Sequence, residues 1–117
     1  MKITKTITRQ FKKEISLDKL LYQVGLLFRN KNISEYLLVE KIIMTVNKNL
    51  NQVVLLENFL VDKKDNEQVK ALKFFVRFNY HKVRDKAKGG DFLVIYYKEL
   101  DKNEFQSKLA TNDYNKS

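Results

Sequence analysis

The run Val69-Lys70-Ala71-Leu72-Lys73-Phe74-Phe75-Val76-Arg77-Phe78-Asn79-Tyr80 is the most informative stretch of the sequence. One set of its apolar residues recurs with a period of two: Leu72, Phe74, Val76, Phe78 and Tyr80. The positions between them form a second set, which consists of Lys73, Phe75, Arg77 and Asn79. Because the side chains of a strand alternate between its two faces, this pattern predicts a half-exposed strand over residues 69–80.

The segments before this run predict a first strand and the clearest helix. Residues 2–11 are rich in β-branched side chains, which favours a strand. The four-residue spacing of their apolar side chains also leaves a helix open. After Ser16, a suitable N-cap, apolar residues recur at helical spacing from Leu17 to Phe28. We therefore expect a strand followed by the main helix.

Three further strands and a short helix complete the expected elements. Residues 36–46 are apolar on both faces, which leaves a buried strand and a buried helix open and favours the strand. Residues 52–61 predict another strand, and residues 92–98 predict one more from aromatic and β-branched side chains. Asp101 and Glu104 have the spacing of a capping box, so a short helical turn should follow them.

These elements predict a single α+β domain. A chain of 117 residues has the size of one ordinary domain, and its hydrophobic fraction of 44% is enough for a core. We expect a small curved mixed β-sheet or pseudo-barrel that is closed by one main helix. The domain should span residues 1–110, and the polar residues 111–117 should form a flexible tail.

The charge of the chain points to an anionic partner. Lys and Arg number 23 against 14 Asp and Glu, so the formal net charge is +9. Such an excess attracts phosphate backbones or acidic membranes, although a codon bias toward Lys, Asn and Ile is an alternative source of it. The absence of cysteine fits a reducing cytoplasm. No apolar run approaches the roughly 18 residues of a membrane span, and Lys19 and Arg29 are the only cations of the main predicted helix, so we expect a cytoplasmic protein without membrane contact.

Catalytic signatures are scarce in this sequence. It has a single histidine, His81, and no cysteine, so a nucleophile with its base is not indicated. Asp62, Asp65 and Glu67 are interleaved with lysines and lack the glycine and spacing of a calcium loop, so we interpret them as a solvated turn. No phosphate-binding loop motif is present. We predict a protein that is not an enzyme and uses neither metal nor cofactor.

Cations interleaved with aromatic side chains favour binding of RNA. Proteins hold single strands through cations along the backbone and aromatic rings that stack on bases. The predicted strand carries both residue types, and the connector after it continues the basic surface. Burial of Phe75 beneath a helix and a simple solvated loop are the alternatives. The candidate contacts are Lys73, Phe75, Arg77, Lys82, Arg84, Lys86 and Lys88.

Two other kinds of partner remain open. The basic face could instead dock an acidic protein, which would make the chain a protein-interaction module. A homodimer is a further alternative if the predicted strand over residues 69–80 stays unpaired at a sheet edge. The target RNA could be a single-stranded or structured messenger.

The segment Lys86-Ala87-Lys88-Gly89-Gly90-Asp91-Phe92-Leu93-Val94-Ile95 resembles the Gly-Asp turn and strand of PUA-like RNA-binding domains. The length, the basic charge and the order of elements also resemble the PrgU-like family of small regulators from enterococcal conjugative plasmids. The resemblance is anchored at residues 86–97. It implies a PUA-like fold and post-transcriptional control that limits production of a plasmid-encoded surface adhesin. The further glycines common in the RNA-facing loop of such domains are absent from this chain.

Overall fold

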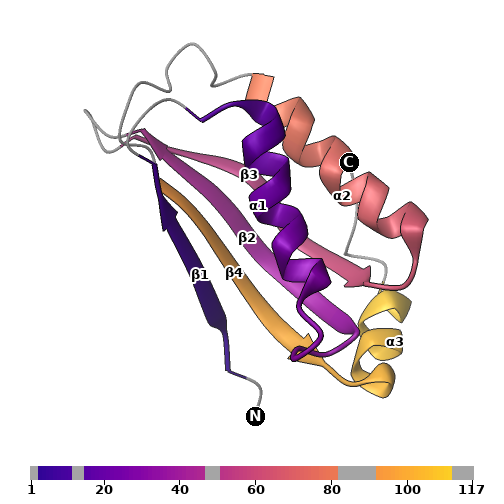
Figure 1. Cartoon of the computed structure of the whole chain (residues 1–117). Coiled ribbons are helices and arrows are strands. Elements are labelled where there is room, and N and C mark those ends of the chain that lie inside the picture. Colours follow the sequence, from indigo (N-terminus) through magenta and orange to yellow (C-terminus); the bar gives the residue numbers. More distant parts are fainter. Residues whose placement is uncertain (1–2, 12–14, 47–50, 82–91, 112–117) are drawn as a thin grey trace.

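The computed structural model describes residues 3–11, 15–46, 51–81 and 92–111 (Figure 1). Its elements follow the order β1 (Lys5–Gln10), α1 (Leu17–Arg29), β2 (Tyr36–Val46), β3 (Asn51–Asp62), α2 (Asn66–His81), β4 (Phe92–Leu100) and α3 (Lys102–Ala110). The predicted connector over residues 82–88 lies outside the described residues, and so does the predicted tail over residues 111–117 except for Thr111, which is the C-cap of α3.

The four strands form one open antiparallel sheet. Their spatial order is β1-β4-β2-β3, so β1 and β3 are its edges in the described part of the chain. β4 pairs with both β1 and β2, which brings the N-terminal strand beside the last one. The predicted α+β class with a small curved sheet is thereby confirmed.

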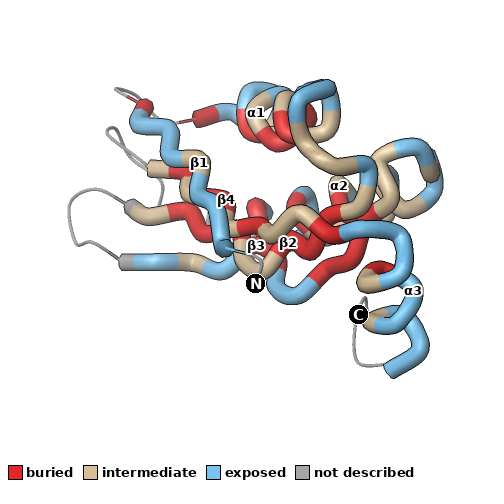
Figure 2. The backbone as a smooth tube through the Cα atoms, turned by 90° about the horizontal axis from the view of Figure 1, so that it is seen from below, coloured by how far each residue is buried: buried red, intermediate tan, exposed pale blue. Residues whose placement is uncertain are grey.

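Helices α1 and α2 lie side by side over one face of this sheet, and α3 packs against one end of the other face (Figures 1 and 2). Leu37 and Leu38 are neighbours in β2, so they point to opposite faces. Leu37 joins the main core under α1 and α2. Leu38 packs in a second cluster with Leu60, Leu100 and Phe105 of α3.

The predicted strand over residues 69–80 is wrong, because this segment is the central part of helix α2. Leu72, Val76 and Tyr80 are its buried residues, and their spacing of four fits a period of two as well as a helix. The two patterns differ at Phe74 and Phe78, which a strand would bury with the other three. In the helix, 59% of Phe74 and 54% of Phe78 are exposed.

The N-terminus of α2 explains why the helix forms here. The carboxylate of Asp65 accepts the backbone N–H of Glu67 at 3.0 Å and of Gln68 at 3.4 Å, as an N-cap does. The side chain of Gln68 accepts the N–H of Asp62 at 2.7 Å. The spacing Asp65-x-x-Gln68 is itself a helix-start signal in the sequence. Lys, Ala, Leu and Arg in the interior favour a helix further.

The remaining element predictions are confirmed. β1 is a strand rather than the helix that its spacing left open, and residues 36–46 form strand β2. Ser16 caps α1 by accepting the N–H of Lys19 at 3.2 Å. Asp101 and Glu104 form a reciprocal capping box at the start of α3.

Candidate nucleic-acid interface

The outward face of α2 combines aromatic and basic side chains. Phe74 and Phe78 are four residues apart, so they lie one turn from each other on the same side of the helix. Both point away from the sheet, because the buried residues of α2 occupy the opposite side. We define the α2 face as five of the exposed residues of this helix: Lys70, Phe74, Arg77, Phe78 and His81. The exposed carboxylate of Glu67 lies on the same side, one turn before Lys70.

Phe74 and Phe78 are two of the six large hydrophobic residues that are exposed in the described part of the chain. Single exposed apolar residues are common on soluble proteins. Two large aromatic side chains on adjacent turns, with Arg77 beside them, form a patch of the kind that marks an interaction surface. Phe74 also contacts the ring of Phe75 at 5.7 Å between centroids, which limits its movement.

The charge of α2 is mostly positive. The helix carries Lys70, Lys73 and Arg77 against one carboxylate, that of Glu67. Glu67 lies in the first turn, where its negative charge interacts favourably with the positive end of the helix dipole. Its carboxylate also pairs with the ammonium group of Lys70 at 3.7 Å. Arg77 lies one turn after Phe74 and directly before Phe78 in the helix. The α2 face therefore presents rings and positive charge together.

The predicted contact residues divide into three groups in the structure. Arg77 is exposed, and Lys73 is half-buried one turn before it on α2. Phe75 is half-buried on the inner side of the helix and meets the ring of Phe59 edge-on at 5.9 Å. Its two neighbours, Phe74 and Phe78, offer far more ring surface to a ligand. The others lie outside the described residues: Lys82, Arg84, Lys86 and Lys88.

The side chain of Asn79 fixes α2 to the sheet edge. Its amide donates to the carbonyl of Leu55 in β3 at 3.1 Å and to the carbonyl of Phe75 at 3.1 Å. The hydroxyl of Tyr80 donates to the carbonyl of Ile15 at 2.8 Å, which ties the end of α2 to the start of α1. These contacts orient the helix so that its aromatic pair faces outward.

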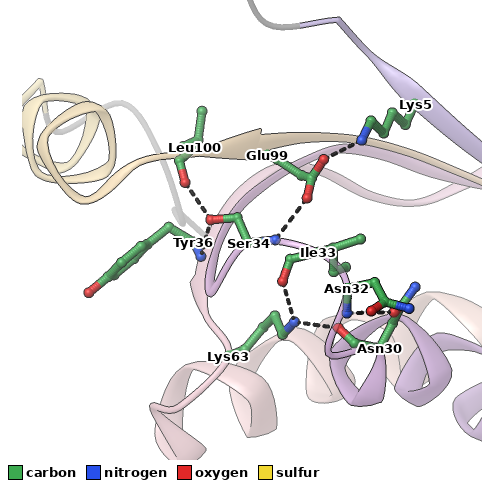
Figure 3. A network of polar contacts seen from close by, with 9 residues as sticks. All are labelled: Lys5, Asn30, Asn32, Ile33, Ser34, Tyr36, Lys63, Glu99 and Leu100. Atoms are coloured by element: carbon green, nitrogen blue, oxygen red, sulfur yellow. Dashed lines mark hydrogen bonds and ion pairs between the residues drawn. The ribbon is translucent and has the colours of Figure 1, made fainter.

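A polar network holds the segment between α1 and β2 (Figure 3). The ammonium group of Lys63 donates to the carbonyls of Asn30 at 2.7 Å and Ile33 at 3.1 Å. Burial lowers the pKa of Lys63 from its ordinary value. The carboxylate of Glu99 accepts the backbone N–H of Ser34 at 2.8 Å and pairs with Lys5, whose pKa this contact raises. The network fixes the end of α1 relative to the turn that precedes α2.

The polar groups of this network are used structurally. The hydroxyl of Ser34 donates to the carbonyl of Leu100 at 2.5 Å and accepts the N–H of Tyr36 at 3.1 Å. A nucleophilic serine needs a base positioned to take its proton, and the Ser34 hydroxyl donates to a backbone carbonyl instead. His81 is exposed at the end of α2 and packs edge-on against Tyr80 at 5.9 Å.

In the predicted solvated turn before α2, the carboxylates accept hydrogen bonds from the backbone. The carboxylate of Asp62 accepts the N–H of Lys64 at 2.9 Å, and that of Asp65 caps the helix. Within the described ranges, no group of three or more His, Cys, Asp or Glu is placed to hold a metal ion. The same ranges contain no helix long and apolar enough to cross a membrane.

A hollow lies on the sheet face opposite α1 and α2. Its volume is about 590 Å³, and it is lined by Glu40, Lys41, Ile43, Gln52, Glu57, Asn58 and Tyr96. Lys41 pairs with Glu57 at 3.7 Å, and Glu40 accepts a hydrogen bond from Thr4 at 2.6 Å. With two carboxylates against one ammonium group, this lining suits a phosphate backbone less well than the α2 face does.

No protein-family model, no curated protein and no solved structure matches this chain. The resemblance to the PrgU-like family therefore stays a prediction. Of the segment that anchors it, residues 86–91 lie outside the described residues, and Phe92–Ile95 begin strand β4.

Proposed function

We propose that this protein is a non-enzymatic RNA-binding regulator and that the α2 face is its contact surface. The observation that carries the proposal is the pair Phe74 and Phe78, exposed on adjacent turns beside Arg77 and Lys70. This combination supplies both components of single-strand binding, which are ring surface for bases and positive charge for phosphates.

The physical contributions of the two components differ. Stacking of a base on an aromatic side chain contributes about 1–3 kcal/mol per base. Arg77 can donate two parallel hydrogen bonds to a phosphate or a base edge, whereas Lys70 acts as a point charge. Binding should weaken as salt rises, because the cations displace counterions from the RNA. The rings should retain a residual affinity that salt does not remove.

The proposed action is post-transcriptional. Occupation of an untranslated region or a structured element would alter the translation or lifetime of a messenger in the cytoplasm. The resemblance to the PrgU-like family suggests that the messenger encodes a plasmid-borne surface adhesin. The sequence that follows α2 adds four cations, which we propose as further contacts: Lys82, Arg84, Lys86 and Lys88.

The test is binding of fluorescently labelled single-stranded RNA to the full chain, measured by anisotropy at two salt concentrations. The double variant Phe74→Ala/Phe78→Ala should lose at least about tenfold in affinity, since two stacking contacts are removed. Val54→Ala and Leu109→Ala are matched controls, because each removes a side chain that is 39% exposed away from the α2 face. Equal affinity of the double variant and the controls would contradict the proposal.

A second candidate function is a protein-interaction module with an acidic partner. Exposed aromatic side chains beside an arginine are also the composition of protein-binding hot spots. Crosslinking of nucleic acid to the protein in cells separates the two functions, with Arg77→Glu/Arg84→Glu as the control variant. Enriched transcripts that disappear in the variant support RNA binding. Recovery of one acidic protein without RNA supports the interaction module.

A further inference from the structure

We propose that helix α1 provides a second stacking position, formed by Tyr22 and Arg29, and that the bound RNA is a single strand crossing from α2 to α1. This inference rests on the proposed function. It adds a site that lies outside the α2 face, and it restricts the RNA to unpaired segments long enough to reach both helices.

Tyr22 and Arg29 form a preassembled pair on the outer side of α1. Tyr22 is 52% exposed, although its ring is large and apolar. The guanidinium carbon of Arg29 lies 4.9 Å from the centroid of that ring, within the range of a cation–π contact. A ring with a guanidinium group beside it offers one surface for a base and a donor fork for the adjoining phosphate.

Gly25 provides the room for this arrangement. Glycine weakens the interior of a helix relative to alanine, so its presence in α1 needs a reason. A Cβ atom at Gly25 would lie 3.1 Å from Nη2 of Arg29, and its three nearest atoms would all belong to Arg29. Core packing therefore does not account for the glycine. Its missing side chain leaves the space that the Arg29 guanidinium group occupies.

The simpler account of Arg29 is electrostatic. It lies in the last turn of α1, where a positive charge interacts favourably with the negative end of the helix dipole. An extended arginine would serve that purpose equally well. The dipole accounts neither for the exposed ring of Tyr22 nor for a glycine under the guanidinium group, whereas a stacking position accounts for both.

The two stacking positions share the outer surface of the helical layer. Leu20, Val24 and Leu27 of α1 are buried on the side that faces the sheet, and Tyr22 lies on the opposite side. Phe74 and Phe78 point outward from α2 in the same way. The helices lie side by side (Figure 1), and packed helices are roughly 8–10 Å apart. A strand of a few nucleotides can span that separation.

Only unpaired bases can use these positions. In a duplex the faces of the bases are stacked inside the helix, and the narrow major groove of A-form RNA excludes side chains. Charge alone would hold duplex and single strand alike. Two ring positions on adjacent helices therefore favour an extended single strand over a duplex of equal charge.

The experiment measures affinities of the full chain for oligouridylates of about four and about ten nucleotides and for a hairpin whose paired stem is closed by a non-nucleotide linker, so that it has no unpaired bases. Tyr22→Ala should lower affinity for the long oligomer about tenfold and leave the short one nearly unchanged. Tyr22→Phe keeps the ring and should bind normally. Phe74→Ala/Phe78→Ala should weaken both oligomers, and the hairpin should bind more weakly than the long oligomer. Circular dichroism verifies that the variants fold.

The outcomes distinguish the two levels of the proposal. If Tyr22→Ala changes affinity for the long oligomer by less than about twofold while Phe74→Ala/Phe78→Ala weakens it, the second position is refuted and the proposed function stands. Hairpin binding as tight as that of the long oligomer would refute the single-strand requirement. If no RNA binds to the unaltered protein, the proposed function itself fails and the inference with it.

Discussion

The inner and outer sides of α2 carry similar residues with different surroundings. Leu72 and Val76 on the inner side are fully buried against the sheet. Phe74 and Phe78 on the outer side leave more than half of each side chain in water. Burial in the core explains the inner residues, whereas it does not explain two outer rings that are more than half exposed. The outer side is therefore where we propose that a partner binds.

The largest expected effect on stability comes from a comparison of two substitutions, one on each side of α2. Leu72→Ala removes a fully buried side chain and should lower the free energy of unfolding by about 3 kcal/mol. Phe74→Ala should change it by less than about 0.5 kcal/mol, because the ring is mostly exposed. Urea unfolding of both variants measures the difference. A loss with Phe74→Ala as large as that with Leu72→Ala would mean that the outer ring is structural.

A smaller effect is expected at the N-terminus of α2. Asp65→Ala removes the side chain that accepts two backbone N–H groups and should cost about 1 kcal/mol of stability. Asp65→Asn retains an oxygen acceptor at this position and should recover most of the loss. Thermal unfolding checks both variants. Equal stability of Asp65→Ala and the unaltered protein would show that the cap contributes little to this helix.

The smallest expected effect is a gain in stability, whereas the two preceding substitutions lower it. Gly25→Ala favours the helical backbone and should raise the stability by up to about 1 kcal/mol, provided that the Arg29 side chain moves by a few tenths of an ångström. The same variant should disturb the pair of Arg29 with Tyr22. Urea unfolding and binding to the long oligouridylate are measured together. Destabilisation would indicate that the guanidinium group is held rigidly in place.

The order and type of most elements could be predicted from local patterns. Local periodicity or composition predicts the correct type for the helix after Ser16 and for the strands over residues 36–46, 52–61 and 92–98. The pairing of β1 with β4 could not be predicted, because the paired residues are far apart in the chain. Such contacts depend on how the whole sheet assembles, which no short window of sequence contains.

The candidate site was predictable only in part. Leu72, Val76 and Tyr80 are spaced by four, a number compatible with both periods, so alternation alone predicts the wrong element. That choice placed Phe75 on the outer surface and Phe74 inside, the reverse of the structure. The signal Asp65-x-x-Gln68 favours a helix. If the run over residues 69–80 is taken as helical, burial of Leu72, Val76 and Tyr80 predicts that Phe74 and Phe78 are the exposed pair.

The edge strand β3 has a consequence for how the molecule behaves when it is crowded. An open sheet edge can recruit further strands, and proteins avoid this by irregularity and by covering backbone groups. β3 changes register near Leu55, whose carbonyl is occupied by Asn79, and Asn58 adopts a left-handed conformation with φ 47°. An incoming strand would meet an interrupted ladder at this edge. Edge-to-edge growth into fibres should therefore start poorly from β3, even at high protein concentration.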